Sequence, residues 1–143
     1  MKKARAVYGL LSFLFLVAGV GVYFLFRDLG DLLFFARLPI FDFGGSARAR
    51  LEPSFFADAL MFNAAGMLWL VSGIMFFRFL WFYNPGAQKV YVGCFCAIAV
   101  ALEAAQLSGG VPGTFDPLDL LFMGAGALAE GLAHKVFVGG KTA

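Results

Sequence analysis

The sequence predicts an all-α, polytopic membrane protein with four transmembrane helices. The chain has 143 residues, of which 62% are hydrophobic, and its mean hydropathy is +0.85. A soluble domain of this size could not bury so much apolar surface. In addition, four stretches meet or approach the length of about 20 mostly apolar residues that a helix needs to cross the hydrocarbon core. We therefore expect residues 1–143 to form a single transmembrane domain.

The four expected helices cover residues 7–26, 54–82, 90–107 and 117–137. The first contains no charge. The second has an uncharged centre between Asp58 and Arg78, and the long side chain of Arg78 can reach the lipid headgroups. The fourth is the weakest by hydropathy because it contains Asp119 and Glu130. We expect its insertion to depend on neighbouring helices.

Residues 31–43, DLLFFARLPIFDF, form an apolar segment between the first two helices. The segment is too short to span the membrane and is broken by Pro39. Two interpretations are open. The segment lies in the membrane surface or dips partway into it, as an interfacial or re-entrant element, or it packs as an apolar loop over the bundle.

The distribution of basic residues predicts that both chain termini are cytoplasmic. This orientation places seven of the eleven basic residues inside: Lys2, Lys3, Arg5, Arg78, Lys89, Lys135 and Lys141. The other four lie in the first outer loop, Arg27, Arg37, Arg48 and Arg50, where they are matched by Asp28, Asp31, Asp42 and Glu52. Trp81 and Tyr83 fit an inner interfacial belt.

The composition argues against several classes of function. The net charge is only +2 and the basic residues are scattered, so nucleic acid is not an expected partner. Cys94 and Cys96 stand two apart on one expected helix, which excludes a mutual disulfide and argues against a shared metal. With one histidine in the chain, no histidine-based metal cluster is expected. We expect no cofactor, although a divalent cation held by carboxylates is compatible with the residue types.

Polar side chains from three expected helices converge near the outer membrane boundary. They are Glu103, Gln106, Asp116, Asp119, Asp58 and, somewhat deeper, Asn63. With a rise of about 1.5 Å per residue, Glu103 lies on the order of 10 Å or less below the outer edge of the hydrocarbon. A charged side chain in this environment costs roughly 2.5 to 3.5 kcal/mol, so such residues usually face a protein interior or a watery cavity. The sequence therefore predicts a polar pocket open to the outer leaflet.

Each of these residues also has a structural explanation. Asp116 before Pro117 is typical of a helix N-cap, and Asp119 can serve the same helix terminus. Asp58 can be an interfacial residue close to water. Glu103 with Gln106 can form a hydrogen-bonded clamp between helices. Both interpretations stay open for each residue.

Small residues predict which helices are neighbours. Alanines recur in residues 97–105, and glycines and alanines recur in residues 124–131. We therefore expect the third and fourth helices to be adjacent, with closely approaching backbones. Glu130, nearly three turns beyond Asp119, can be neutralised by Arg78 or Lys135, and His134 is expected to be an interfacial residue rather than a catalyst.

The third and fourth expected helices together resemble the signature of VanZ-like membrane proteins. The matching residues are Glu103-x-x-Gln106, then VPGTFDPLD from Val111 to Asp119, then LLFMGAGALAEG up to Gly131. The sequence departs from the family pattern at Thr114, where arginine is common, and at Met123, where asparagine is common. The resemblance implies a four-helix protein of the bacterial cytoplasmic membrane, related to glycopeptide resistance, and it implies site roles for Glu103, Gln106, Asp116 and Asp119.

Three functions follow as hypotheses. The protein binds or acts on a lipid-linked envelope component or an amphiphilic drug. Alternatively, it is a proton- or cation-coupled transporter subunit, for which four helices would require a homodimer to build a path. The third hypothesis is a structural membrane subunit without catalysis. Whether any reaction is catalysed stays open, and membrane lipids are the expected surroundings in every case.

Overall fold

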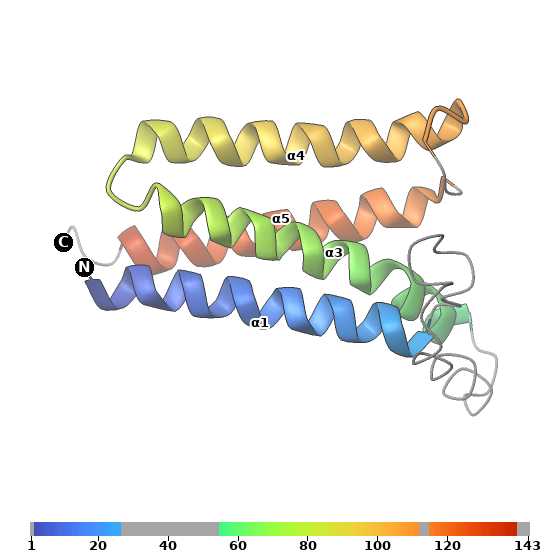
Figure 1. Cartoon of the computed structure of the whole chain (residues 1–143), viewed down its shortest axis with the longest axis horizontal. Helices are drawn as coiled ribbons and strands as arrows, with labels where there is room; N and C mark the ends of the chain where they lie inside the picture. Colours follow the sequence, from blue (N-terminus) through green and yellow to red (C-terminus); the bar gives the residue numbers. More distant parts are fainter. Residues whose placement is uncertain (1, 27–54, 112–114, 140–143) are drawn as a thin grey trace, which may run out of the picture.

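The computed structural model describes residues 2–26, 55–111 and 115–139, except for the side chains of residues 24–26, 55–62 and 138–139. Within these ranges the fold is all-helical, with α1 (Lys2–Phe26), α3 (Phe55–Leu80), α4 (Pro85–Leu107) and α5 (Pro117–Gly139) (Figure 1). All four helices are long and apolar enough to cross a membrane, which confirms the predicted fold class. The predicted interfacial segment at residues 31–43 lies outside the described residues.

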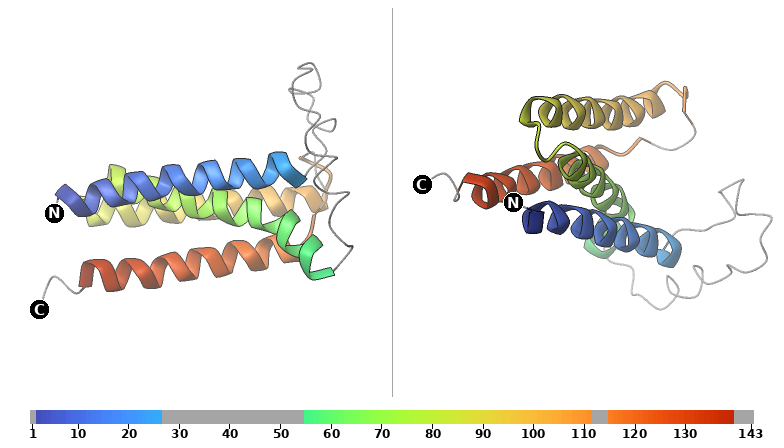
Figure 2. Two further views of the ribbon diagram at one scale, coloured as in Figure 1. Left: turned by 90° about the horizontal axis from the view of Figure 1, so that it is seen from below. Right: turned by 60° about the vertical axis from the view of Figure 1, so that its left-hand side comes forward.

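Successive helices run in opposite directions, so that the two chain ends lie at the same end of the bundle (Figure 1). We call the end that holds Lys2 and Gly139 the terminus end, and the opposite end, where α4 leads into α5, the far end. Helix α3 lies at the centre and packs against each of the other three helices (Figure 2). The arrangement is that of a multi-pass membrane protein.

Helix α1 is joined to α3 by apolar packing and by a reciprocal pair of hydrogen bonds. Tyr8 of α1 packs with Val71 and Met75 in a buried cluster. The Ser12 hydroxyl donates to the Ser72 carbonyl and the Ser72 hydroxyl donates to the Ser12 carbonyl, each at 2.9 Å. These bonds satisfy two hydroxyl groups that would otherwise be buried without partners in an apolar environment.

Helix α4 is held against α3 by a ladder of aromatic rings. Trp81 stacks on Tyr91 with centroids 4.9 Å apart and ring planes 4° apart. Phe95 contacts Phe77 and Trp69, with centroid distances of 5.5 and 5.1 Å. The Phe95 ring occupies the space beside Gly73 that any larger residue would fill.

The expectation that α4 and α5 have closely approaching backbones was wrong. These helices have few contacts with each other, whereas each of them packs against α3. The small residue Gly126 of α5 instead approaches α3, where an added Cβ would lie 2.6 Å from Met67 Cγ. Small residues permit close approach but do not specify which helix makes it.

Helix α4 begins at Pro85, five residues before the expected start. Asn84 is the N-cap, since its side-chain oxygen accepts a hydrogen bond from the Ala87 N–H at 3.0 Å. Proline at the first helical position fits the same terminus. The additional turn brings Gln88 into the helix, where its side chain is buried.

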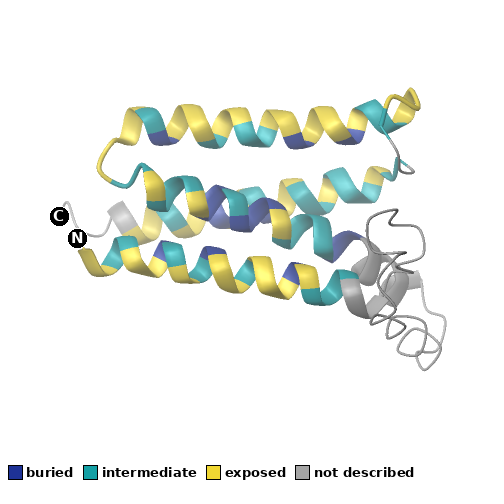
Figure 3. Cartoon of the chain, in the orientation of Figure 1, coloured by how far each residue is buried: buried dark blue, intermediate teal, exposed yellow. Residues whose placement is uncertain are grey.

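Large apolar side chains are exposed along most of the bundle surface, especially on α1 and α4 (Figure 3). Phe13 is 62% exposed and Ile98 is 57% exposed. In a membrane these side chains contact lipid, where their exposure carries no hydrophobic penalty. Polar side chains, by contrast, are costly in lipid and need hydrogen-bond partners or a polar space.

Candidate functional site

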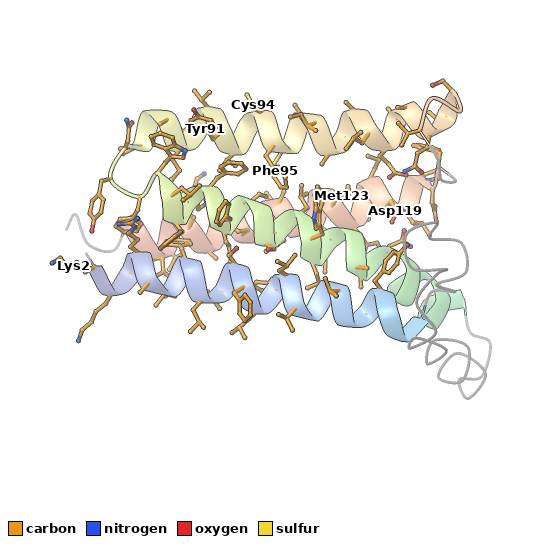
Figure 4. All side chains as sticks on the ribbon, in the orientation of Figure 1. Lys2, Tyr91, Cys94, Phe95, Asp119 and Met123 are labelled. Carbon is orange, nitrogen blue, oxygen red and sulfur yellow. The ribbon has the colours of Figure 1, made fainter. Side chains whose placement is uncertain are left out.

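Three helices bring predicted site residues to the far end of the bundle. Glu103 lies in the last turns of α4, and Asp116 immediately precedes α5. Asp119 lies in the first turn of α5 (Figure 4). Asn63 lies eight residues after the start of α3, which is about 12 Å along the helix axis. Asp58 is also part of α3, but its side chain lies outside the described residues.

Asp116 caps the N-terminus of α5, as the sequence predicted. Its carboxylate oxygen Oδ1 accepts a hydrogen bond from the Leu118 N–H at 2.9 Å, and Pro117 is the first helical residue. The Asp116 carbonyl accepts a hydrogen bond from the Asp119 N–H at 3.0 Å. This geometry satisfies backbone donors that a helix start would leave without partners.

We expect Asp116→Ala to lower the free energy of unfolding by about 1 kcal/mol, because the cap acceptor is lost. Asp116→Asn retains an equally good cap and should leave the stability within a few tenths of a kcal/mol of the wild type. Titration of the purified protein with SDS in mixed micelles measures both values. Equal losses in the two variants would show that the charge, and not the cap, stabilises this helix start.

Glu103 connects α4 to the start of α5. Its side chain is buried, with a residue exposure of 6%. One carboxylate oxygen accepts from the Gln106 side-chain amide and the other from the Asp116 N–H, both at 3.4 Å. The second contact is the interhelical hydrogen bond that the clamp interpretation expects, although both distances are at the long end for a hydrogen bond.

The carboxylate of Asp119 faces α3. A Cβ built on Gly66 would lie 3.8 Å from Asp119 Oδ1 and 3.7 Å from Met123 Cε. Asn63, one turn before Gly66, is only 1% exposed. At the far end, Asp119 therefore faces α3. Glu103, on α4, contacts the backbone at Asp116 instead.

The described part of the far end carries acidic side chains and no basic ones. Every lysine and arginine in the described ranges lies in the terminus half of its helix: Lys2, Lys3, Arg5, Arg78, Lys89 and Lys135. The described residues include no group of three or more His, Cys, Asp or Glu side chains arranged to hold a metal ion. The divalent cation considered from the sequence therefore gains no support from these residues.

A second polar group, at the terminus end, was only partly predicted. The guanidinium of Arg78 donates two hydrogen bonds to the carboxylate of Glu130, at 2.7 and 2.8 Å. It donates a third to the Gln88 side-chain oxygen at 3.2 Å, and the Gln88 amide donates to the Arg78 carbonyl at 3.3 Å. This group joins α3, α4 and α5. It confirms Arg78 as the partner of Glu130.

The expectation that Arg78 extends to the headgroups was wrong. The Arg78 side chain is 12% exposed and that of Glu130 only 2%. A buried guanidinium needs a hydrogen-bonded counter-charge in place of water, and the bidentate carboxylate of Glu130 provides it. His134, predicted to be interfacial, forms a 2.7 Å hydrogen bond through Nδ1 with the hydroxyl of Tyr8, so it links α5 to α1. The sequence did not predict the roles of Gln88 and Tyr8. A single polar residue in an apolar helix has no periodic pattern that would indicate its partner.

No family model, curated protein or solved structure matches this chain. The resemblance to VanZ-like proteins therefore stays a prediction that depends on the residues between Glu103 and Gly131.

Proposed function

We propose that this multi-pass membrane protein is a VanZ-like protein that binds an amphiphilic component of the bacterial cell envelope at its far end. The polar part of the binding site consists of Glu103, Gln106, Asp119 and Asn63, and Asp116 caps the helix start beside it. The apolar surfaces of the surrounding helices contact the acyl or prenyl part of the ligand. A lipid-linked precursor and an amphiphilic drug both fit this description.

The main support is the burial of Glu103 within an apolar span. Helix α4 qualifies as a membrane span over its whole length, and Glu103 is 6% exposed near its far end. A carboxylate in this position is expensive unless it is hydrogen-bonded or lines a polar space. Asp119, on the adjoining helix, is half-buried and faces α3 rather than Glu103. Two acids at one level on separate helices favour a ligand that presents several hydrogen-bond donors or a positive charge.

The charge distribution supports a location of the far end at the outer leaflet. All described basic residues lie toward the terminus end, and basic residues are retained on the cytoplasmic side of membranes. We therefore propose that both termini are cytoplasmic and that the protein resides in the bacterial cytoplasmic membrane. A ligand of the far end would then be an outer-leaflet molecule.

A structural subunit is the second candidate function, because Glu103 already accepts a hydrogen bond from the Asp116 N–H. The transporter hypothesis lacks comparable support. Between the far-end acids and Glu130, α3, α4 and α5 pack through an apolar cluster that includes Leu70, Ile74 and Met123. A proton or cation path would have to cross this cluster.

Photolabelling with a diazirine-bearing dodecylamine, a cationic amphiphile, tests the binding function. In the wild type we expect labelled peptides from the far-end parts of α4 and α5. Glu103→Gln retains an oxygen that can accept the Asp116 N–H, so the clamp survives while the charge is lost. We expect this variant to fold normally and to be labelled roughly tenfold less, which corresponds to about 1.4 kcal/mol of binding energy.

Asp116→Asn is the matched control, because it also removes one far-end charge but keeps the helix cap. We expect its labelling to stay close to that of the wild type. Equal labelling of the wild type and Glu103→Gln would contradict the binding function. Failure of Glu103→Gln to fold would instead favour the structural subunit.

A further inference from the structure

Arg5 is held in a fixed position at the terminus end. Its Nε donates a hydrogen bond of 3.1 Å to the Phe79 carbonyl, near the C-terminus of α3. The guanidinium lies over the Phe79 ring at 4.8 Å and near the Tyr83 ring at 5.7 Å, measured to the ring centroids. A cation stacked on aromatic rings and bonded to a helix C-terminus is favourably placed. The position of the guanidinium is therefore set before any ligand binds.

The two terminal nitrogens of the Arg5 guanidinium have N–H donors that bond to no other described residue. Within the described part of the chain, the two terminal nitrogens of Arg5 make no hydrogen bond and no ion pair. Arg78 differs, because both its terminal nitrogens are bonded, one to Gln88 and one to Glu130. A planar fork of N–H donors matches two oxygens of a phosphate group.

The surroundings of Arg5 are positively charged. Lys2 lies one helical turn before Arg5 on the same face of α1, Lys3 lies on the other side of the helix, and both are exposed. Figure 4 shows Lys2 at the outermost turn of α1. In the terminus half of the described helices the acidic residue is Glu130, which is buried and bonded to Arg78. It therefore does not neutralise the exposed lysines.

The height of Arg5 in the bundle corresponds to the headgroup region. Arg5 is bonded to Phe79, in the last turn of α3, and Tyr83 follows in the connection to α4. Tyrosine and tryptophan concentrate at the membrane–water interface, and Trp81 and Tyr83 are both in this connection. At that depth the anionic groups in a bilayer are lipid phosphates.

We propose that Arg5, together with Lys2, forms a binding site for the phosphate group of an acidic phospholipid. The guanidinium of Arg5 donates from its terminal nitrogens to two phosphate oxygens, and Lys2 supplies additional positive charge. Arg5 itself joins α1 to α3 through its hydrogen bond to the Phe79 carbonyl. The site is separate from the far end and does not depend on the function proposed there.

Native mass spectrometry of the full-length protein, titrated with phosphatidylglycerol and phosphatidylcholine, tests this site. The wild type should retain phosphatidylglycerol in preference to phosphatidylcholine. Arg5→Gln should reduce that retention by roughly fivefold or more, equivalent to about 1 kcal/mol. Lys135→Gln is the matched control, because it removes the same charge from an exposed residue at the same end, and should change the retention by less than about twofold.

Equal losses in Arg5→Gln and Lys135→Gln would overturn the proposal, because diffuse attraction would then explain the binding. Absence of a preference in the wild type would also overturn it. Millimolar inorganic phosphate should not displace the lipid, and displacement would assign the site to free phosphate instead.

Arg5 also holds α1 on α3, so the folding of its variant has to be measured separately. The thermal midpoint in phosphatidylcholine micelles provides this measurement. If Arg5→Gln does not fold, Lys2→Gln, which is one turn away and exposed, is used with Lys89→Gln as its matched control. Retention of phosphatidylglycerol must then fall in Lys2→Gln and not in Lys89→Gln. A fall in Lys89→Gln without one in Lys2→Gln would contradict the site.

Discussion

Replacing Glu130 with leucine is expected to lower the free energy of unfolding by about 3 to 5 kcal/mol, because it leaves the buried guanidinium of Arg78 without a counter-charge. The pair is bidentate, and the side chains of Arg78 and Glu130 are only 12% and 2% exposed. At this degree of burial, water can do little to replace the lost carboxylate. Titration with SDS in mixed micelles provides the measurement.

The double variant Arg78→Leu/Glu130→Leu is the informative comparison. Both charges are then absent, and an apolar pair of similar volume is often as stable as a buried ion pair. We expect the double variant to recover most of the stability lost by Glu130→Leu. The remaining loss should reflect Gln88, which keeps its own buried amide but loses the guanidinium as a hydrogen-bond donor.

A loss of less than about 1 kcal/mol in Glu130→Leu would contradict the conclusion that the pair is buried. Losses in that range are measured for ion pairs exposed to solvent. The result would mean that water or lipid phosphate reaches Arg78 in the membrane. A double variant as unstable as Glu130→Leu would show that packing, and not the uncompensated charge, limits stability at this position.

The helices were predictable from the sequence because each depends on local chemistry. An apolar run of sufficient length fixes a membrane helix whatever its neighbours are, and Asp116 with Pro117 fixes the start of α5. The pairing of Glu130 with Arg78 was one of two alternatives, because a buried acid requires a cation and few are available. Charge and length are properties that a sequence displays directly.

The packing partners were not predictable in the same way. Nothing in the spacing of Gly126 indicates that it approaches α3 and not α4. The direction of the Asp119 carboxylate depends on the space beside Gly66. Gly66 is eight residues beyond Asp58, the last acid of α3, and has no charged or polar side chain that would indicate this contact. The contact of Arg5 with the Phe79 carbonyl joins residues 74 positions apart. Such contacts depend on three-dimensional shape.

The close approach of α5 to α3 leads to the second large effect, which is expected for Gly126→Val. The Cβ of any larger residue would lie 2.6 Å from Met67 Cγ and 3.0 Å from Val71 Cγ2. The neighbouring side chains or the helix must therefore move apart. We expect the free energy of unfolding to fall by about 1 to 3 kcal/mol, the usual range for overpacking.

Gly124→Val is a matched control on the same helix, because a Cβ at Gly124 has no atom within 4 Å. This variant should be as stable as the wild type, since valine there extends toward lipid. Adding Met67→Ala to Gly126→Val removes the side chain that the new methyl groups meet, and it should restore part of the lost stability. Equal stability of the two glycine variants would mean that α5 lies farther from α3 in the membrane. Asp119 would then no longer be held beside Gly66, and the geometry of the far-end site would change with it.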